Sequence, residues 1–175
     1  MNKSAKLIVL SVIYEREKMT LLIKNGRLVD PKSNRDEVLD ILIENDKIVK
    51  IGLNLSVENA EIVDARGLVV APGLIDVHVH FREPGQTHKE TIHSGAKSAA
   101  AGGFTRVVMM ANTKPILSTP KVLTETLEIA DKEDIKIDAV GSITQDFDGE
   151  NLTDFDALIK ACLLYTSPSP RDMRR

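Results

Sequence analysis

Four polar residues with side chains suited to binding a metal or an anion occur at every second position of one short stretch. They are Asp76, His78, His80 and Arg82, and they are separated by Val77, Val79 and Phe81. Side chains two residues apart on a β-strand share a face, so the polar set is predicted to point together while the apolar set points into the surrounding core. Two imidazoles on one face can both reach a single ion through short metal–nitrogen bonds, so His78 and His80 are candidate zinc ligands.

A His-x-His pair is a weak signal by itself, because in most proteins such a pair has a structural or accidental origin. Its position gives it weight here. Residues 74–80 are predicted to form a strand, the first of three that alternate with helices after Pro72-Gly73. The pair lies at the carboxyl end of this strand, which is where parallel-barrel enzymes place their catalytic groups.

The helix that follows this first strand is predicted from its end signals. Thr87 and Glu90 form a capping-box pattern that indicates a start at Thr87, and Gly102-Gly103 indicates the end. His88 and His93 fall in its first turns, where exposed or loop-supporting roles are favoured over metal binding. The double glycine is a helix stop, not a phosphate cradle.

Two further strand–helix units follow. One strand is predicted over 105–111, with Met109-Met110 as core residues. Another is predicted over 135–143. Thr119-Pro120 opens the second helix, since proline suits a first turn, and Asp154 opens the third, with its carboxylate near the helix N-terminus rather than on a metal. Three such units fit an open doubly wound sheet as well as part of a barrel, so periodicity alone leaves both open.

Residues 19–71 are predicted to form a separate β-rich module. Asn25-Gly26, Asn45-Asp46 and Arg66-Gly67 lie between apolar runs and indicate hairpin turns. The module also carries many acidic residues, which are interpreted as a solvated face rather than an acidic site. They are Asp30, Asp36, Glu37, Asp40, Glu44 and Asp46.

The two ends of the chain are interpreted as additions to this pattern. Residues 1–18 are predicted to be an upstream extension of a natural start at Met19, and their short apolar run lacks the features of a secretion signal. Residues 162–175 abandon the helical pattern and resemble the translation of a sequencing-library adapter, so they are predicted to be a non-native tail on a truncated gene. Cys162 is therefore not a candidate nucleophile.

Composition excludes several classes of function. The net charge of −3 gives no basic surplus for nucleic acid or an anionic membrane, and aromatic residues make up only 3% of the chain, too few for a base-stacking platform. A single cysteine excludes an intramolecular disulfide and favours a reducing cytoplasm. A cytoplasmic protein that acts on a small molecule is the prediction.

The motif region resembles a known family. The stretch PGLIDVHVHFREPGQTHKETIHSGAKSAAAGGFTRVVMMANTKP is similar to the opening motif of the amidohydrolase superfamily in its dihydroorotase form, with similarity from about Leu21 to Ala161. The part Pro-Gly-x-Ile-Asp-x-His-x-His is specific to metal-dependent hydrolases. The continuations Arg82-Glu83-Pro84-Gly85 and Asn112-Thr113-Lys114-Pro115 narrow the resemblance to dihydroorotases; allantoinases and hydantoinases share them less.

The resemblance implies an α/β fold: the first three βα units of a TIM barrel over 72–161, preceded by part of a small β-sandwich over 19–71. It implies that His78 and His80 bind zinc, one or two ions in the intact enzyme, and that Arg82 and Asn112 hold the substrate carboxylate. The remaining metal ligands and the catalytic aspartate of the family lie beyond Ala161. No catalytic residue is therefore expected in this chain, which is predicted to be inactive alone.

The activity implied is the reversible cyclisation of N-carbamoyl-L-aspartate to dihydroorotate in de novo pyrimidine biosynthesis. Two alternatives stay open: another cyclic amidohydrolase, such as an allantoinase or a dihydropyrimidinase, and a catalytically dead homologue that serves as an assembly partner of aspartate transcarbamoylase. The intact protein is expected to form a homodimer or to associate with aspartate transcarbamoylase.

Overall fold

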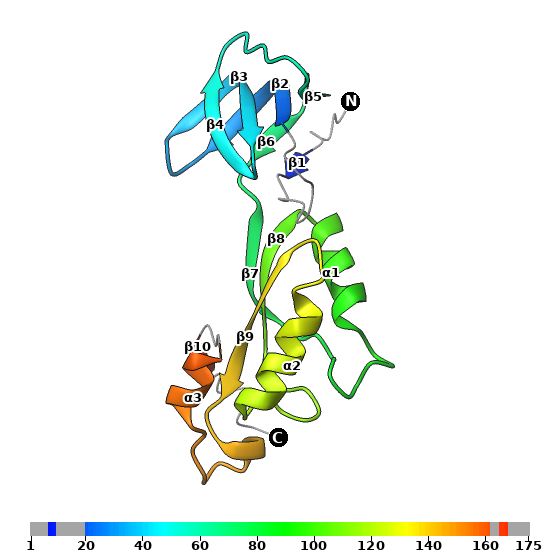
Figure 1. The fold of residues 1–175 in the computed structure, drawn as a ribbon, viewed down its shortest axis with the longest axis vertical. Helices are drawn as coiled ribbons and strands as arrows, with labels where there is room; N and C mark the ends of the chain where they lie inside the picture. Colours follow the sequence, from blue (N-terminus) through cyan, green and yellow to red (C-terminus); the bar gives the residue numbers. More distant parts are fainter. Residues whose placement is uncertain (1–6, 10–19, 162–164, 168–175) are drawn as a thin grey trace, which may run out of the picture. The chain divides into compact units, whose positions relative to one another are not determined.

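The computed structural model describes residues 7–9, 20–161 and 165–167 (Figure 1). The predictions that residues 1–18 are an extension and that 162–175 are a non-native tail fall mostly outside these residues and stay predictions. Contacts divide the chain into two compact units, Met1–Leu74 and Ile75–Arg175, here called the β unit and the α/β unit. None of the helices in the described part is long and apolar enough to cross a membrane.

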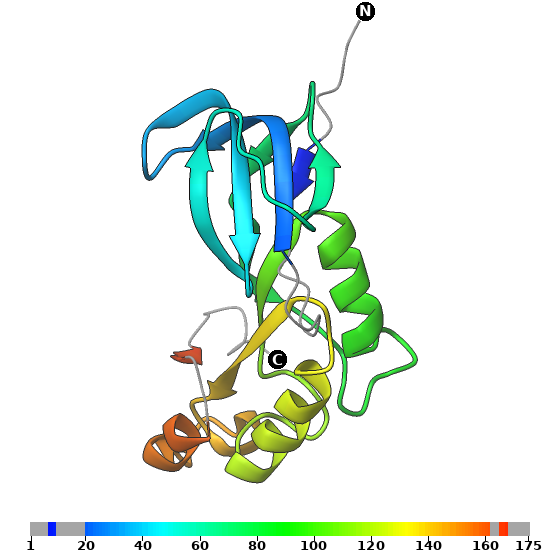
Figure 2. The same cartoon turned by 45° about the horizontal axis from the view of Figure 1, so that its top comes forward.

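The β unit is built on one mixed sheet, whose curved strands are clear in Figure 2. The sheet order is β1-β6-β2-β3-β4, and β5 also pairs with β2. The strands are β1 (Leu7–Val9), β2 (Thr20–Asp30), β3 (Arg35–Glu44), β4 (Lys47–Gly52), β5 (Glu61–Asp64) and β6 (Val69–Ala71). Strands β2, β3 and β4 form an antiparallel meander. The predicted turn at Asn45-Asp46 is confirmed, with positive φ at both residues.

The predicted hairpin turn at Asn25-Gly26 is wrong, because both residues lie inside the continuous strand β2. Pairing with β3 passes from Ile23↔Ile41 to Gly26↔Leu39, so β2 carries one extra residue and forms a β-bulge. Asn25 has φ of 60°, the conformation that the turn signal indicates. The signal therefore marks the backbone conformation correctly but not the end of the strand.

The hairpin predicted at Arg66-Gly67 is also wrong. Strands β5 and β6 both pair with β2 in parallel, β5 along Leu21–Lys24 and β6 along Arg27-Leu28. The bulge lies between these two stretches. Gly26 suits this position, because a Cβ there would stand 2.6 Å from a methyl carbon of Val70 on β6.

One acidic residue of the β unit is not on a solvated face. Asp40 is 3% exposed, and its carboxylate accepts hydrogen bonds from the backbone N–H groups of Asn25 at 2.8 Å and Leu55 at 2.9 Å. The ammonium of Lys24 lies 3.8 Å away. The prediction of a solvated role is therefore wrong for Asp40, whereas Asp36 is exposed and pairs with Arg27.

The α/β unit contains a four-stranded sheet of order β10-β9-β8-β7. Strands β8, β9 and β10 pair in parallel. Helix α1 packs against β8, and α2 packs against β9 (Figure 1). The elements are β7 (Leu74–Val79), α1 (Ile92–Ala101), β8 (Phe104–Met109), α2 (Pro120–Ala130), β9 (Lys136–Ser142), the short 3-10 helix η1 (Gln145–Phe147), α3 (Phe155–Lys160) and β10 (Tyr165–Ser167).

Two of the three predicted helix starts are confirmed. The Thr119 hydroxyl accepts from the Val122 N–H ahead of Pro120, and the Asp154 carboxylate accepts from the Ala157 N–H at 3.0 Å. The start predicted at Thr87 is wrong, because α1 begins at Ile92 with Thr91 as its N-cap. Thr91 and Ser94 form a reciprocal capping box, which takes the place of the one predicted four residues earlier.

The core of the α/β unit lies between the sheet and its helices. Strands β8 and β9 supply fully buried residues such as Val107, Met109 and Ala139, and Leu123 comes from α2. Phe81, after β7, is 4% exposed, as the alternation predicts. Val77 is 58% exposed, so its predicted core position is wrong for this structure. Strand β7 is the last in the sheet order, which leaves part of its apolar side uncovered by the described residues.

Candidate metal centre

The two histidines of the motif converge on one point. The Nε2 atoms of His78 and His80 lie 3.2 Å apart, and the ring centroids are 5.0 Å apart with an interplanar angle of 71°. Two zinc–nitrogen bonds of about 2.0–2.1 Å at a tetrahedral angle would hold their nitrogens roughly 3.3 Å apart. The pair therefore fits two neighbouring positions of a tetrahedral zinc ion. The described residues contain no cluster of three or more such ligands.

Asn112, which follows the next strand β8, contacts His80 of this pair. Its Oδ1 lies 2.8 Å from Nδ1 of His80. The contact arises because β7 and β8 are neighbours in the sheet and the N–H of Met110 donates to the carbonyl of Val79 at 2.9 Å. The residues that follow the two strands are thereby brought together. The sequence did not predict this histidine–asparagine hydrogen bond.

Arg82 follows β7 and is half-buried. Within the described part of the chain its guanidinium has no hydrogen-bond or ion-pair partner, so its five donors stay available to a ligand. Asp76 plays a different part: its Oδ1 accepts from the backbone N–H of His78 at 2.9 Å. It also lines an open pocket of about 280 Å³ together with His80 and Glu90.

The loops that carry Arg82 and Asn112 are joined by backbone contacts. The N–H of Lys114 donates to the carbonyl of Pro84 at 3.0 Å. Gly85 has φ of +88°, and a Cβ there would overlap the backbone carbonyl of Lys114. Only glycine allows this approach together with this conformation. The loop after β7 and the loop after β8 are therefore held together through their backbones.

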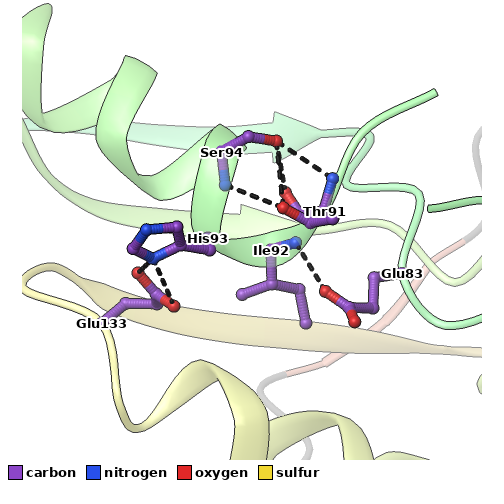
Figure 3. A network of polar contacts seen from close by, with 6 residues as sticks. All are labelled: Glu83, Thr91, Ile92, His93, Ser94 and Glu133. Carbon is purple, nitrogen blue, oxygen red and sulfur yellow. Dashed lines mark hydrogen bonds and ion pairs between the residues drawn. The ribbon is translucent and has the colours of Figure 1, made fainter. Parts of the chain in front are cut away.

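The start of α1 anchors the first of these loops (Figure 3). The Glu83 carboxylate accepts from the Ile92 N–H at 2.9 Å, next to the Thr91–Ser94 capping box. His93, on the exposed side, lies 3.0 Å from the Glu133 carboxylate in the segment between α2 and β9. His93 thus links α1 to the segment that follows α2, and His88 is exposed in the turn before α1. Among the described residues, neither His88 nor His93 forms a hydrogen bond or ion pair with His78 or His80.

The family model described as dihydro-orotase-like matches residues 67–168. The chain belongs to this family. It is 99% identical over 143 residues to a dihydroorotase of Lactococcus lactis subsp. lactis (strain IL1403), which covers 82% of this chain and 34% of the relative. It is 61% identical over 141 residues to a dihydroorotase of Streptococcus thermophilus (strain CNRZ 1066), 81% of this chain and 33% of that protein. The chain thus spans about a third of the length of these relatives.

Solved structures show the same mixed α/β architecture. An L-hydantoinase (dihydropyrimidinase) from Arthrobacter aurescens matches with a TM-score of 0.65 and 27% identity, over 73% of this chain and 29% of its own. A crystal structure of a dihydroorotase matches with a TM-score of 0.58 and 17% identity, over 84% of this chain and 41% of its own. At that identity the second match shows the fold alone.

Proposed function

We propose that the intact protein is a zinc-dependent dihydroorotase, which interconverts N-carbamoyl-L-aspartate and dihydroorotate in de novo pyrimidine biosynthesis in the cytoplasm. The observation that carries the proposal is the convergence of the His78 and His80 Nε2 atoms at 3.2 Å, in a chain whose relatives are named dihydroorotase. The finer fold belongs to the proposal too: residues 72–161 are the first three βα units of a TIM barrel, and 19–71 are part of a β-sandwich.

In the proposed enzyme, the site residues bind either the metal ion or the substrate. His78 and His80 would hold the zinc ion, which when bound supplies Lewis acidity and lowers the pKa of water at the site. Arg82 would bind the substrate carboxylate, because its planar fork matches the two oxygens and the described residues leave it unpaired. The Asn112 amide would donate a further hydrogen bond to the same group. These residues bind and orient, and the proton-transfer group lies elsewhere in the longer protein.

The chain by itself is proposed to be inactive. A catalytic zinc site uses three protein ligands, and the described residues bring only two nitrogens together. The intact protein is proposed to act on a small molecule and to form a homodimer or to associate with aspartate transcarbamoylase.

The test uses the full-length Lactococcus lactis relative with alanine at the positions that align with His78 and His80. We expect loss of bound zinc and a fall in dihydroorotate hydrolysis of at least about 10³-fold, because ligand loss removes the ion that stabilises the developing charge. His93→Ala is the matched control and should retain both properties. Metal-free protein with unchanged activity, or hydrolysis by the chain alone, would overturn the proposal.

The alternative function of the intact protein is hydrolysis of another cyclic amide. It is supported by the L-hydantoinase, which shares the architecture at 27% sequence identity. The two activities differ in whether the ring carries a carboxylate. If Arg82 binds that carboxylate, Arg82→Leu in the full-length relative should weaken kcat/KM for dihydroorotate by about 10²-fold or more and leave hydantoin turnover low. Preferential turnover of hydantoin or dihydrouracil by the unaltered enzyme would favour the hydantoinase alternative.

A further inference from the structure

We propose that Asn112 is a positioning residue for the metal ligand His80, in addition to contacting substrate. This inference rests on the proposed function. In it, Oδ1 of Asn112 holds His80 in the tautomer whose Nε2 carries no hydrogen, and the Nδ2 amide of the same side chain stays free for the substrate carboxylate. One amide would thus connect the metal ligand to the group that orients the substrate.

The tautomer follows from the chemistry of the contact. An amide oxygen can only accept a hydrogen bond, so the 2.8 Å contact requires His80 to donate from Nδ1. A neutral imidazole with its hydrogen on Nδ1 has a lone pair on Nε2, which is the form that binds a metal. This Nε2 is the atom that lies 3.2 Å from Nε2 of His78. The hydrogen bond therefore prepares the nitrogen that faces the shared point.

The backbone around Asn112 is fixed well enough for such a role. Its neighbours Ala111 and Thr113 are both 3% exposed. The Thr113 N–H and the Leu117 N–H donate to the Ala111 carbonyl at 2.9 and 3.2 Å, and the Thr113 hydroxyl donates to the Pro115 carbonyl at 2.6 Å. A side chain carried by a turn with these bonds loses little freedom when it contacts His80.

The other end of the amide is open. Nδ2 of Asn112 has two hydrogens, and within the described residues the only hydrogen bond of this side chain is the one between Oδ1 and His80. The amide can therefore accept from the ligand histidine and donate to an anion at the same time. Aspartate at this position would keep the acceptor and lose the donor, whereas leucine would lose both. These two substitutions separate the two roles.

The first experiment is nitrogen-15 NMR of the histidine side chains in this chain without metal, in mildly alkaline buffer. We expect His80 to carry its hydrogen on Nδ1 in the unaltered chain and in Asn112→Asp. In Asn112→Leu the His80 signals should move toward the mixed or Nε2–H pattern. Asn151→Leu, which makes the same change at an exposed position, should leave the pattern unaltered.

The second experiment measures zinc affinity and kinetics in the full-length Lactococcus lactis relative. Asn112→Leu should lower zinc affinity by about 10–100-fold, as loss of a group that orients a ligand does. Asn112→Asp should retain zinc affinity and raise KM, because the carboxylate donor is lost. A variant that fails to fold leaves the decision to the NMR spectrum of the unaltered chain.

The two hypotheses fail in different ways. Hydrogen on Nε2 of His80 in the unaltered chain, or an unchanged tautomer and zinc affinity in Asn112→Leu, would overturn the positioning role even if the enzyme is active. An Nδ1–H tautomer in a full-length protein that binds no zinc and turns over no dihydroorotate would refute the proposed function and leave the hydrogen bond standing.

Discussion

Asp40 in the β unit and Arg82 in the α/β unit are both charged, yet their surroundings are opposite. Asp40 is buried, and two backbone N–H groups and the Lys24 ammonium satisfy its carboxylate. Arg82 is half-buried and has no partner among the described residues. A buried charge survives only when its partners are supplied by the fold, whereas a recognition site needs a charge that the fold leaves free. The comparison separates residues that hold the structure from residues that can bind.

The largest effect is expected when the buried charge is removed. Asp40→Ala leaves the Asn25 and Leu55 N–H groups without acceptors and Lys24 without its counter-charge, so the free energy of unfolding should fall by about 3 kcal/mol. Urea denaturation measures this change, and amide hydrogen exchange at Asn25 and Leu55 should accelerate with it. The control is Asp36→Ala, which breaks an exposed, solvent-screened ion pair and should lower the free energy of unfolding far less. Equal losses for the two variants would contradict the comparison.

A smaller loss of stability is expected at the backbone contact between the two site loops. Gly85→Ala places a Cβ against the Lys114 carbonyl at a positive φ and should destabilise the chain by about 2 kcal/mol. Gly149 has a φ of +78°, and no atom lies within 4 Å of the position that a Cβ would take there, so Gly149→Ala carries the backbone strain alone. Urea denaturation should show Gly85→Ala to be the more damaging by about 1 kcal/mol. No difference would mean that the loops can separate freely.

The smallest effect concerns an exposed carboxylate that the fold satisfies. The backbone N–H groups of Glu150 and Asn151 donate to Asp148 and lower the pKa of its carboxyl below the ordinary value. Its stabilisation is therefore complete above the unfolded-state pKa of about 3.8 and is lost as pH falls through the lower, folded-state pKa. Asp148→Asn should flatten the decline of the urea midpoint in this acidic window. Glu150→Gln keeps the donating N–H and should retain the steeper decline.

Some local signals mark the predicted elements and others do not: the helix starts at Thr119 and Asp154 are confirmed, whereas the hairpin turn predicted at Asn25-Gly26 is not. Thr119-Pro120 and Asp154 each cap a helix through a side chain a few residues away. The start of α1 was misplaced because two capping patterns occur in succession, at Thr87 and at Thr91. Glu83 favours the second by accepting from the Ile92 N–H, and this contact across nine residues is invisible to a local pattern. The buried role of Asp40 depends in the same way on distant backbone donors.

In the candidate site, too, local features could be predicted from the sequence, whereas contacts between distant residues could not. The convergence of His78 and His80 could be predicted from the two-residue period of a strand, and the structure shows their rings together. The Asn112–His80 hydrogen bond joins residues 32 positions apart and depends on which strands are neighbours. The exposure of Val77 depends on the same sheet order. Zinc binding by the two histidines and carboxylate binding by Arg82 and Asn112 stay predictions.

The bulge at Asn25 has a consequence for the order in which the β unit folds. The meander of β2, β3 and β4 uses short turns, whereas β5 and β6 reach β2 only after the chain has closed a much longer loop. Contacts between residues close in sequence form faster, so the meander is expected to assemble before β5 and β6 arrive. Asn25 would then already be held by Asp40 when its other neighbours dock. The bulge would then fix the register in which β5 and β6 pair with β2, one strand on each side of it.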